Sequence, residues 1–186
     1  MASVTETTSD LPTEFFKRRI IFLTGEVNDA LAQKVIMQLL MLDSESSDDI
    51  TMYINSPGGS VASGLAIYDT MQHVKSDVST IGVGTAASMG AFLLMAGAPT
   101  KRFVLPNAQV LIHQPLGGVS GQATDIQIVA DRIIETRNRL NELIAKHTGQ
   151  TLKRIKADTD RDRWMWAEEA VSYGIADAIK YPSELQ

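Results

Sequence analysis

Apolar residues recur along the chain in two spacings that alternate from one segment to the next. Short continuous apolar runs are typical of strands buried on both faces of a sheet, and they occur at 20–23, 50–54, 78–83, 102–105, 109–113 and near 175–179. Apolar residues three and four positions apart predict amphipathic helices at 29–42 and 123–147, and further helices are expected at 60–74, 151–159 and 167–173. Because strands and helices alternate, the pattern predicts an α/β fold with a largely parallel sheet.

Several of the expected helices have residues at their ends that favour starting or stopping a helix. Ser60 follows two glycines and is placed to cap the helix at 60–74. Gly149 is placed to close the long helix at 123–147. A further helix is expected to begin near Ser88, shortly after the strand at 78–83.

The first residues differ in composition from the rest of the chain. Residues 1–13 are rich in Ser, Thr and acidic residues and contain a proline, which predicts a flexible N-terminal arm. No repeat or linker divides residues 14–186, so we expect one domain there. The N-terminus lacks the features of a secretory signal, and the apolar run at 89–98 is far shorter than the roughly 20 residues that span a bilayer. We therefore expect a cytoplasmic protein that does not associate with membranes.

The composition excludes several classes of function. The chain of 186 residues carries a formal net charge of −5, whereas a nucleic-acid partner would require a clustered basic face. It has no cysteine, so disulfides, thiolate metal sites and a cysteine nucleophile are excluded. No metal site is predicted, and a catalytic nucleophile would have to be another type of residue.

Two glycine-containing junctions lead from a predicted strand into a predicted helix. The first, at 53–64, contains Gly58 and Gly59, which allow the backbone to approach a ligand closely. The second, at 84–91, reads GTAASMGA and consists almost wholly of small residues. Ser88 is expected at a helix N-terminus, where free N–H groups favour developing negative charge. The sequence around it is similar to a G-x-S-x-G nucleophile elbow, with alanine in place of the first glycine.

A serine nucleophile needs a base, and the chain has three histidines that could supply one. His147 lies in the last turn of the long helix, where a structural role is expected. His73 lies near the end of the helix at 60–74 and is interpreted as a surface or interface residue. His113 ends the apolar strand at 109–113, and the carboxyl ends of parallel strands are where α/β sites usually lie. His113 is therefore the best candidate for the base.

The carboxylate that would orient the base cannot be chosen from the pattern of residues. The segment DTDRDRWMW at 158–166 offers Asp158, Asp160 and Asp162, and nothing in their spacing ranks them. The charged residues alone favour a solvated turn.

Six segments make the chain resemble the proteolytic subunit of the Clp ATP-dependent protease, the ClpP family. They are YINSPGGS, GTAASMGAFLL, IHQPLGG, GQATDI, NELIAKHTGQ and DTDRDRW, and the resemblance runs from about residue 16 to about residue 179. It implies a spiral of repeated β-β-α units with a protruding handle at about 114–150, made of a strand and the long helix. It also implies a catalytic triad and an oxyanion hole made of backbone N–H groups. The triad would be Ser88, His113 and Asp162, and the oxyanion hole Gly59 and Met89.

The same resemblance implies an enclosed assembly of two stacked seven-membered rings. Unfolded polypeptides would be delivered by a Clp-type AAA+ ATPase, which uses the ATP, so the chain itself would need no cofactor. The segment at 117–125 would bind substrate as an added strand. The substrate-binding residues would be Gly117, Gly118, Val119, Gly121 and Gln122, while Asp160 and Arg161 would make ring-to-ring contacts.

Three departures from the family pattern bear on partners and specificity. The N-terminal segment is shorter than the family's and dissimilar to the stretch that forms its axial pore. Thr51 and His73 stand where many members carry aromatic residues in the pocket that docks the ATPase, although Tyr53 matches. Trp166 replaces a small residue shortly after the triad acid, which bears on the local geometry or the specificity pocket. The first two departures fit one isoform of a pair that works in a mixed complex.

Three functions are therefore carried forward. The leading interpretation is a self-compartmentalised serine endopeptidase. The second is a weakly active structural or regulatory subunit of a mixed ClpP complex with a sister isoform. The third, from another class, is an acyl-thioester enzyme of the related crotonase fold, which would need no Ser/His/Asp set.

Overall fold

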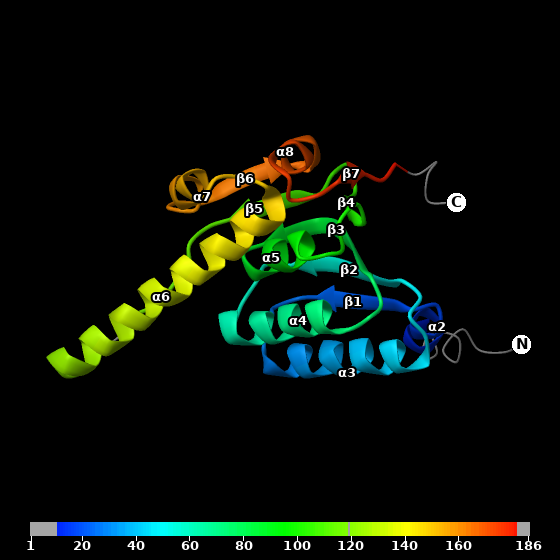
Figure 1. The fold of residues 1–186 in the computed structure, drawn as a ribbon, viewed down its shortest axis with the longest axis horizontal. Coiled ribbons are helices and arrows are strands. Elements are labelled where there is room, and N and C mark those ends of the chain that lie inside the picture. The colour runs from blue at the N-terminus through cyan, green and yellow to red at the C-terminus, as the bar shows by residue number, and fades with distance from the viewer. Residues whose placement is uncertain (1–10, 119, 182–186) are drawn as a thin grey trace, which may run out of the picture.

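The computed structural model describes residues 11–118 and 120–181 (Figure 1). Its helices are α2 (Leu11–Lys17), α3 (Asp29–Glu45), α4 (Val61–His73), α5 (Met89–Met95), α6 (Ala123–Thr148), α7 (Leu152–Asp158) and α8 (Ala167–Tyr173). Its strands are β1 (Ile20–Thr24), β2 (Ile50–Ser56), β3 (Val78–Ala87), β4 (Arg102–Val104), β5 (Gln109–Ile112), β6 (Arg163–Trp166) and β7 (Ala178–Ile179). The predicted α/β class is confirmed.

The strands form a mixed sheet in which most neighbours are parallel. The order is β1-β2-β3-β4-β7, with β5 parallel to β3 and antiparallel to β6. The first part of β3 pairs with β4, and its last three residues, from Thr85 to Ala87, pair with β5. The change of partner occurs at Gly84, which has a φ of 64°, and the Thr85 N–H then donates to Asn55 Oδ1 at 3.2 Å. This bend directs the end of β3, and the residue after it, toward β5.

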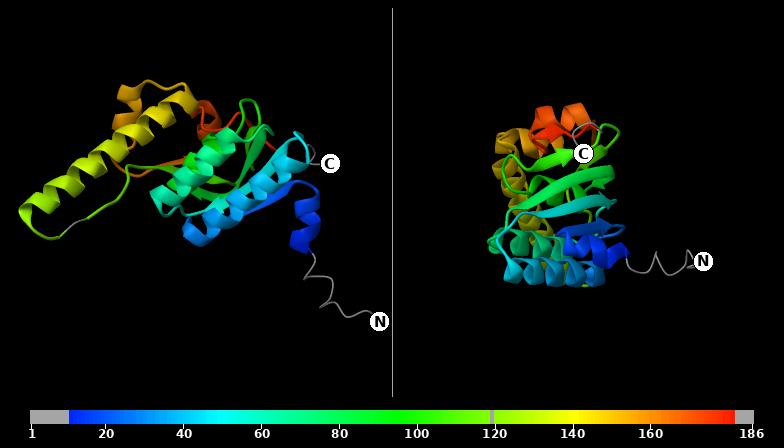
Figure 2. Two further views of the ribbon diagram at one scale, coloured as in Figure 1. Left: turned by 60° about the horizontal axis from the view of Figure 1, so that its bottom comes forward. Right: turned by 90° about the vertical axis from the view of Figure 1, so that its right-hand side faces the viewer.

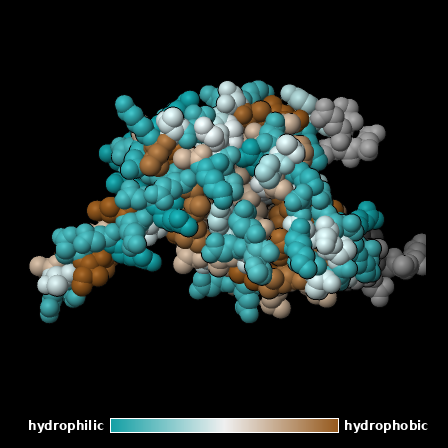
Figure 3. All heavy atoms as spheres, viewed as in Figure 1, coloured by the Kyte–Doolittle hydropathy of each residue, from teal (hydrophilic) through white to brown (hydrophobic). Residues whose placement is uncertain are grey.

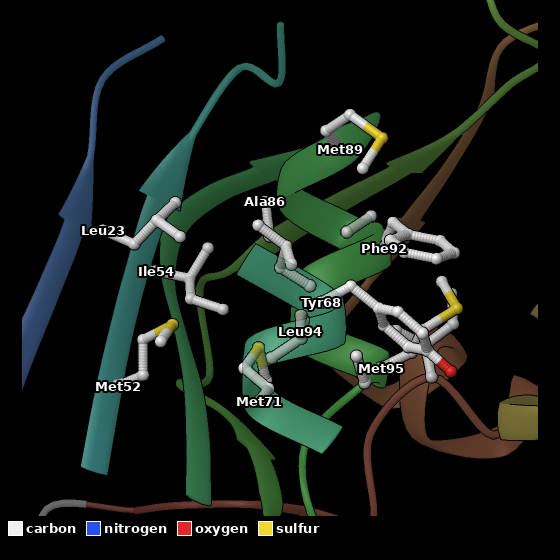
Figure 4. Close-up of a cluster of buried hydrophobic side chains, with 14 of the residues drawn as sticks. Leu23, Met52, Ile54, Tyr68, Met71, Ala86, Met89, Phe92, Leu94 and Met95 are labelled. Atoms are coloured by element: carbon white, nitrogen blue, oxygen red, sulfur yellow. The ribbon is translucent and has the colours of Figure 1, made fainter. Parts of the chain in front are cut away.

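Helices α3, α4 and α5 lie against one face of the sheet and enclose the core (Figure 1). In the close-up of Figure 4, Leu23, Met52 and Ile54 extend from the strands toward the side chains of α4 and α5. All seven residues of α5 are buried, although so short a helix is not stable in isolation. Burial of each large apolar side chain contributes about 1.5–3 kcal/mol. Packing against the core therefore stabilises α5 and fixes the position of its N-cap residue, Ser88.

Both predicted helix caps are present. Ser60 is the N-cap of α4, and its Oγ accepts a hydrogen bond from the Ser63 N–H at 3.2 Å. Gly149 follows α6 in the left-handed conformation, with a φ of 72°, and its N–H donates to Ala145 O at 3.0 Å.

The long helix α6 projects from the body of the molecule (Figures 1 and 2). Its buried residues all lie in its C-terminal half, whereas the projecting part exposes large apolar side chains, which Figure 3 shows among polar ones. These exposed side chains are Ile126, Ile128, Val129 and Ile134. Among the described residues, no helix is both long and apolar enough to cross a membrane.

The strand expected in the handle is not a strand in this chain. Of the expected segment 117–125, residues 117–118 and 120–122 pair with no other segment and residues 123–125 begin α6, while Val119 lies outside the described residues. A strand needs a neighbouring strand to satisfy its backbone groups, and the projecting part of a single chain provides none. The expectation of a strand therefore fails for the isolated chain.

Helix α2 begins inside the segment expected to be a flexible arm. Residues 1–10 lie outside the described part, but Leu11–Lys17 is helical, so the expectation is wrong for residues 11–13. Phe15 packs edge-on against Phe22 of β1, with ring centroids 5.2 Å apart, and Phe16 packs against the core. These aromatic contacts hold a helix that buries none of its residues fully.

The end of the chain differs from the prediction at two strands. Strand β6 lies within 158–166, where a solvated turn was favoured, because Met165 is buried and the segment pairs antiparallel with β5. Strand β7 occupies only the last two residues of the run near 175–179. The residues before it belong to the end of α8, where Gly174 is the C-cap and the Ile175 N–H donates to Ala170 O.

Candidate active site

Ser88 stands at a sharp turn between β3 and α5. It is the N-cap of α5 and has a φ of 53° and a ψ of −118°, a conformation that costs a non-glycine residue about 1–3 kcal/mol. Its N–H donates to Leu111 O of β5 at 2.9 Å, and the buried helix that follows holds it from the other side. The strained turn presents the Ser88 hydroxyl beyond the end of the strand, as in a nucleophile elbow.

The backbone of Gly58 passes so close to this turn that a side chain would not fit. A Cβ at Gly58 would lie 2.6 Å from Ser88 Cβ and 2.8 Å from Ala87 O, and the φ of Gly58 is 93°. A Cβ at Gly90 would lie 2.8 Å from Ser56 O. The two glycine-containing junctions therefore meet, which explains why glycine occupies positions 58 and 90.

His113 and Asp162 complete a continuous chain of contacts with Ser88. His113 Nε2 lies 2.8 Å from Ser88 Oγ, and His113 Nδ1 lies 3.1 Å from Asp162 Oδ1. Because a carboxylate only accepts hydrogen bonds, Nδ1–H donates to Asp162 and Nε2 is free to accept the Ser88 proton. The His113 side chain is 15% exposed, whereas that of Asp162 is 64% exposed. The structure thus brings together the residue after β3, the residue after β5 and a residue of the turn before β6.

The other two histidines are engaged elsewhere. His147 Nε2 lies 3.0 Å from Tyr68 Oη, and burial, together with the charges of Lys146 and Arg102, lowers the pKa of His147 to about 4. His73 is exposed at the end of α4. Neither lies beside Ser88, in agreement with the structural and surface roles expected for them.

The two other aspartates of the 158–166 segment also have different surroundings. Asp158 accepts hydrogen bonds from Tyr173 Oη at 2.8 Å and from Arg163 Nη1 at 3.0 Å. Asp160 is exposed, and its Oδ2 lies 4.0 Å from Nε of the neighbouring Arg161. Asp162 is therefore the one of the three that contacts His113.

Two backbone N–H groups flank the Ser88 turn without an acceptor among the described residues. They belong to Gly59 and Met89, and neither is paired in a sheet, turn or cap. Both neighbours of Gly59 are bonded to Val27: Gly58 O accepts from the Val27 N–H at 2.8 Å, and the Ser60 N–H donates to Val27 O at 2.7 Å. These bonds fix the backbone at Gly59. Free, fixed N–H groups beside a hydroxyl can bind the oxygen of a polarised carbonyl.

A narrow apolar pocket opens beside Ser88 and His113. Its apolar lining includes Val61, Met89, Phe92, Ile112, Leu140 and Ile144, contributed by α4, α5, β5 and α6. Of these lining residues the sequence singled out only Met89, for its backbone N–H. The others lie in segments that were predicted as helices or strands but not as parts of a pocket. Among the described residues, no group of three His, Asp or Glu side chains is placed to hold a metal ion.

The sequence matches the family model for Clp protease over residues 3–182. The chain belongs to the Clp protease family. The resemblance inferred from the six segments is thereby confirmed, and it covers nearly the whole chain. The Clp protease family consists of serine peptidases, and it implies ring-shaped oligomers that work with an AAA+ ATPase.

The described residues expected to bind substrate in a Clp protease all lie at the surface. Gly117, Gly118, Gly121 and Gln122 are exposed, at the start of the projecting part. The ring-contact candidates Asp160 and Arg161 are exposed as well, with side chains 62% and 90% accessible. Their roles remain predictions, since they concern groups outside the single chain.

The three residues expected to dock a Clp ATPase do not form one pocket within the chain. Thr51 and Tyr53 share one face of β2, where Tyr53 stacks on Phe22 with centroids 5.6 Å apart. The alternate residues Met52 and Ile54 face the core beneath α4, so His73, at the end of α4, belongs to the opposite face of the sheet. A pocket that included all three would need a neighbouring subunit.

Trp166 does not line the pocket beside Ser88. It pairs with Gln109 from the outer strand β6, and its side chain is half exposed. Its backbone N–H donates to Glu169 Oε2 at 3.0 Å. Trp166 was expected to bear on the local geometry or on the specificity pocket, and it lies outside the pocket beside Ser88.

Proposed function

We propose that the chain is the proteolytic subunit of a self-compartmentalised, ATP-dependent serine endopeptidase that degrades unfolded proteins. The observation that carries the proposal is the unbroken path from Ser88 Oγ through the His113 ring to Asp162 Oδ1, with contacts of 2.8 and 3.1 Å. Membership of a family of serine peptidases supports the same chemistry.

In the proposed reaction, His113 Nε2 takes the Ser88 proton as the hydroxyl oxygen attacks the peptide carbonyl. Asp162 keeps the imidazole in the required tautomer and stabilises its cation. The Gly59 and Met89 N–H groups bind the oxyanion, and losing one such donor typically costs about 10²–10³ in rate. His113 then protonates the leaving amine, and water hydrolyses the acyl-enzyme.

The surroundings of the triad fit an extended, unfolded substrate. The pocket beside Ser88 has a mainly apolar lining, which favours an apolar substrate side chain next to the cleaved bond. The unpaired backbone around Gly117, Gly118 and Gly121 can pair with a peptide as an added strand, which reads little side-chain information. Such a site would cleave many sequences, so it requires enclosure. The exposed apolar side chains of α6 support assembly into stacked rings, with ATP used by a partner ATPase and no cofactor bound by this chain.

The proposal is tested by labelling the assembled protein with a fluorophosphonate probe. We expect label on Ser88, none on a Ser88→Ala variant, and full label on Ser44→Ala, which removes an exposed serine of α3. Label mapped to another serine, or its persistence in Ser88→Ala, would refute the assignment.

A weakly active subunit of a mixed complex is the second candidate. It is favoured by Thr51 and His73, which supply less aromatic area for docking an ATPase loop than the family pattern does. Native mass measurement beside a fluorogenic-peptide assay separates the two candidates: a large active assembly supports the first, and a large inactive one supports the second. The crotonase-type alternative does not account for the contacts of Ser88, His113 and Asp162.

A further inference from the structure

The carboxylate of Asp162 is weakly held by its own side-chain contacts. Its bond to His113 Nδ1, at 3.1 Å, is its one side-chain contact within the described part of the chain, and the side chain is 64% exposed. Exposed pairs of this kind contribute little stabilisation. The position of Asp162 relative to His113 therefore depends on the backbone of residues 159–162, which connects α7 to β6.

Gln114, the residue after His113, binds this backbone segment at two points. Its N–H donates to Thr159 O at 2.6 Å, and its side-chain Nε2 donates to Asp160 O at 2.9 Å. Thr159 is 1% exposed, so the first of these bonds joins Gln114 to a fixed point. The second lies two residues before Asp162, in the exposed part of the turn.

The other end of the Gln114 amide faces α6. Arg137 Nη1 lies 3.4 Å from Gln114 Oε1, at the limit of hydrogen-bond distance. Because Arg137 can only donate and Asp160 O can only accept, the orientation of the amide follows from its two neighbours. A glutamate of the same size would keep the contact with Arg137 and would lose the bond to Asp160 O.

We infer that Gln114 is a positioning residue, which holds the turn that carries Asp162 against the strand end that carries His113. The inference rests on the proposed triad. Gln114 contacts neither Ser88 nor a reacting atom, and it acts through the backbone of Asp160. Without its amide, the exposed Asp162 carboxylate is free to move away from Nδ1, and the imidazolium that forms during the reaction loses its stabilisation.

The test compares Gln114→Met and Gln114→Glu with the wild type, each as the full-length assembly. Both variants keep the size of the side chain and remove the donor to Asp160 O. We expect kcat to fall about 10–100-fold with KM within about twofold, short of the roughly 10⁴-fold loss typical when a triad acid is disabled. In Gln114→Met, which adds no charge beside His113, the acidic limb of the kcat/KM profile should move to lower pH, because the imidazolium is less stabilised.

The matched control is Gln72→Met. Gln72 Nε2 donates to Ala96 O at 3.0 Å, an equivalent glutamine-to-carbonyl bond away from Ser88. This variant should keep the wild-type kcat and pH profile. If it reproduces the losses of the Gln114 variants, the effect is general destabilisation and the inference is wrong.

Amide hydrogen exchange of residues 159–163, followed by mass spectrometry, provides a readout that does not require activity. Exchange should be faster in Gln114→Met than in the wild type and unchanged in Gln72→Met. Unchanged exchange, or wild-type kcat and pH profile in Gln114→Met, would overturn the positioning role. A wild-type assembly that the fluorophosphonate fails to label would instead refute the proposed peptidase, so the two failures are distinguishable.

Discussion

At the end of α6, His147 is placed so that its ring stays neutral. Its Nε2 contacts Tyr68 Oη, and its imidazole packs edge-on against the Tyr68 ring with centroids 5.6 Å apart. Burial, with the nearby charges of Lys146 and Arg102, lowers its pKa from the usual 6.5 to about 4. The native structure therefore stabilises the neutral form of the His147 side chain relative to its protonated form.

This preference predicts a loss of stability on acidification. The contribution of His147 is fully present above about pH 6.5 and is lost as the pH falls toward 4, because the unfolded chain takes up the proton first. Allowing for partial solvent screening, we expect acidification to remove about 1–2 kcal/mol per subunit from the free energy of unfolding through His147. Thermal unfolding between pH 7.5 and 4.5 should show a smaller acid-induced decrease in Tm for His147→Gln than for the wild type. Parallel pH dependences in the two proteins would contradict the prediction.

At the scale of elements, one guanidinium joins the ends of three helices. Arg102 Nη1 donates to His147 O at 2.8 Å, to Gly174 O at 3.0 Å and, at 3.5 Å, to Met95 O. These carbonyls end α6, α8 and α5, where unpaired C=O groups favour a cation. Arg102 also pairs with Asp177. Burial alone would raise the pKa of Asp177, but the hydrogen bonds and charge of Arg102 outweigh it and hold that pKa below its usual value.

Arg102→Met should therefore destabilise the protein more than the loss of a surface ion pair would. Removing one partner of a largely buried pair leaves the carboxylate uncompensated, and we expect a loss of about 2–4 kcal/mol in the free energy of unfolding. The double variant Arg102→Met/Asp177→Asn should recover part of this loss, since no unpaired charge remains. Denaturant unfolding of the wild type, the single variant and the double variant measures both the loss and the recovery in the free energy of unfolding. A single variant as stable as the wild type, or a double variant no better than the single one, would refute this account.

At the scale of the whole molecule, the projecting half of α6 exposes apolar side chains that a solitary chain would leave in water (Figure 3). The family implies ring-shaped oligomers, and Arg161, 90% exposed in the single chain, has little contact within it. A cation so exposed, in the turn between α7 and the triad acid, is free to contact another subunit. We therefore expect Arg161 to act in assembly rather than in chemistry.

Reversing this charge should separate the rings. Arg161→Glu is expected to shift sedimentation from double rings toward single rings, with peptidase activity falling in parallel. Lys153→Glu makes the same change of charge on the exposed side of α7 and should leave sedimentation unchanged. If Arg161→Glu lost activity while its double ring stayed intact, Arg161 would belong to the site rather than to the assembly.

Elements with a strong local signal were predicted closely. The apolar runs and the helical spacings identified β1 to β5 and α3 to α8, and Ser60 and Gly149 marked helix ends correctly. Such patterns are readable because burial on one face of a helix, or on both faces of a parallel strand, repeats at a fixed interval in the sequence. Strand β6 was not predicted, because the residues before it in the sequence are charged and it pairs with β5, more than fifty residues earlier in the chain.

Ser88 could be proposed from its place at the start of a predicted helix within a run of small residues, and His113 from its place at the end of a predicted strand, because element ends are local properties. The choice of Asp162 over Asp158 and Asp160 could not be made that way without the family resemblance. It depends on which carboxylate the pairing of β6 with β5 brings within 3.1 Å of His113 Nδ1. Likewise, the link between Gln114 and Asp160 joins residues 46 positions apart. Contacts of this kind have no period in the sequence, since they are set by how distant segments pack.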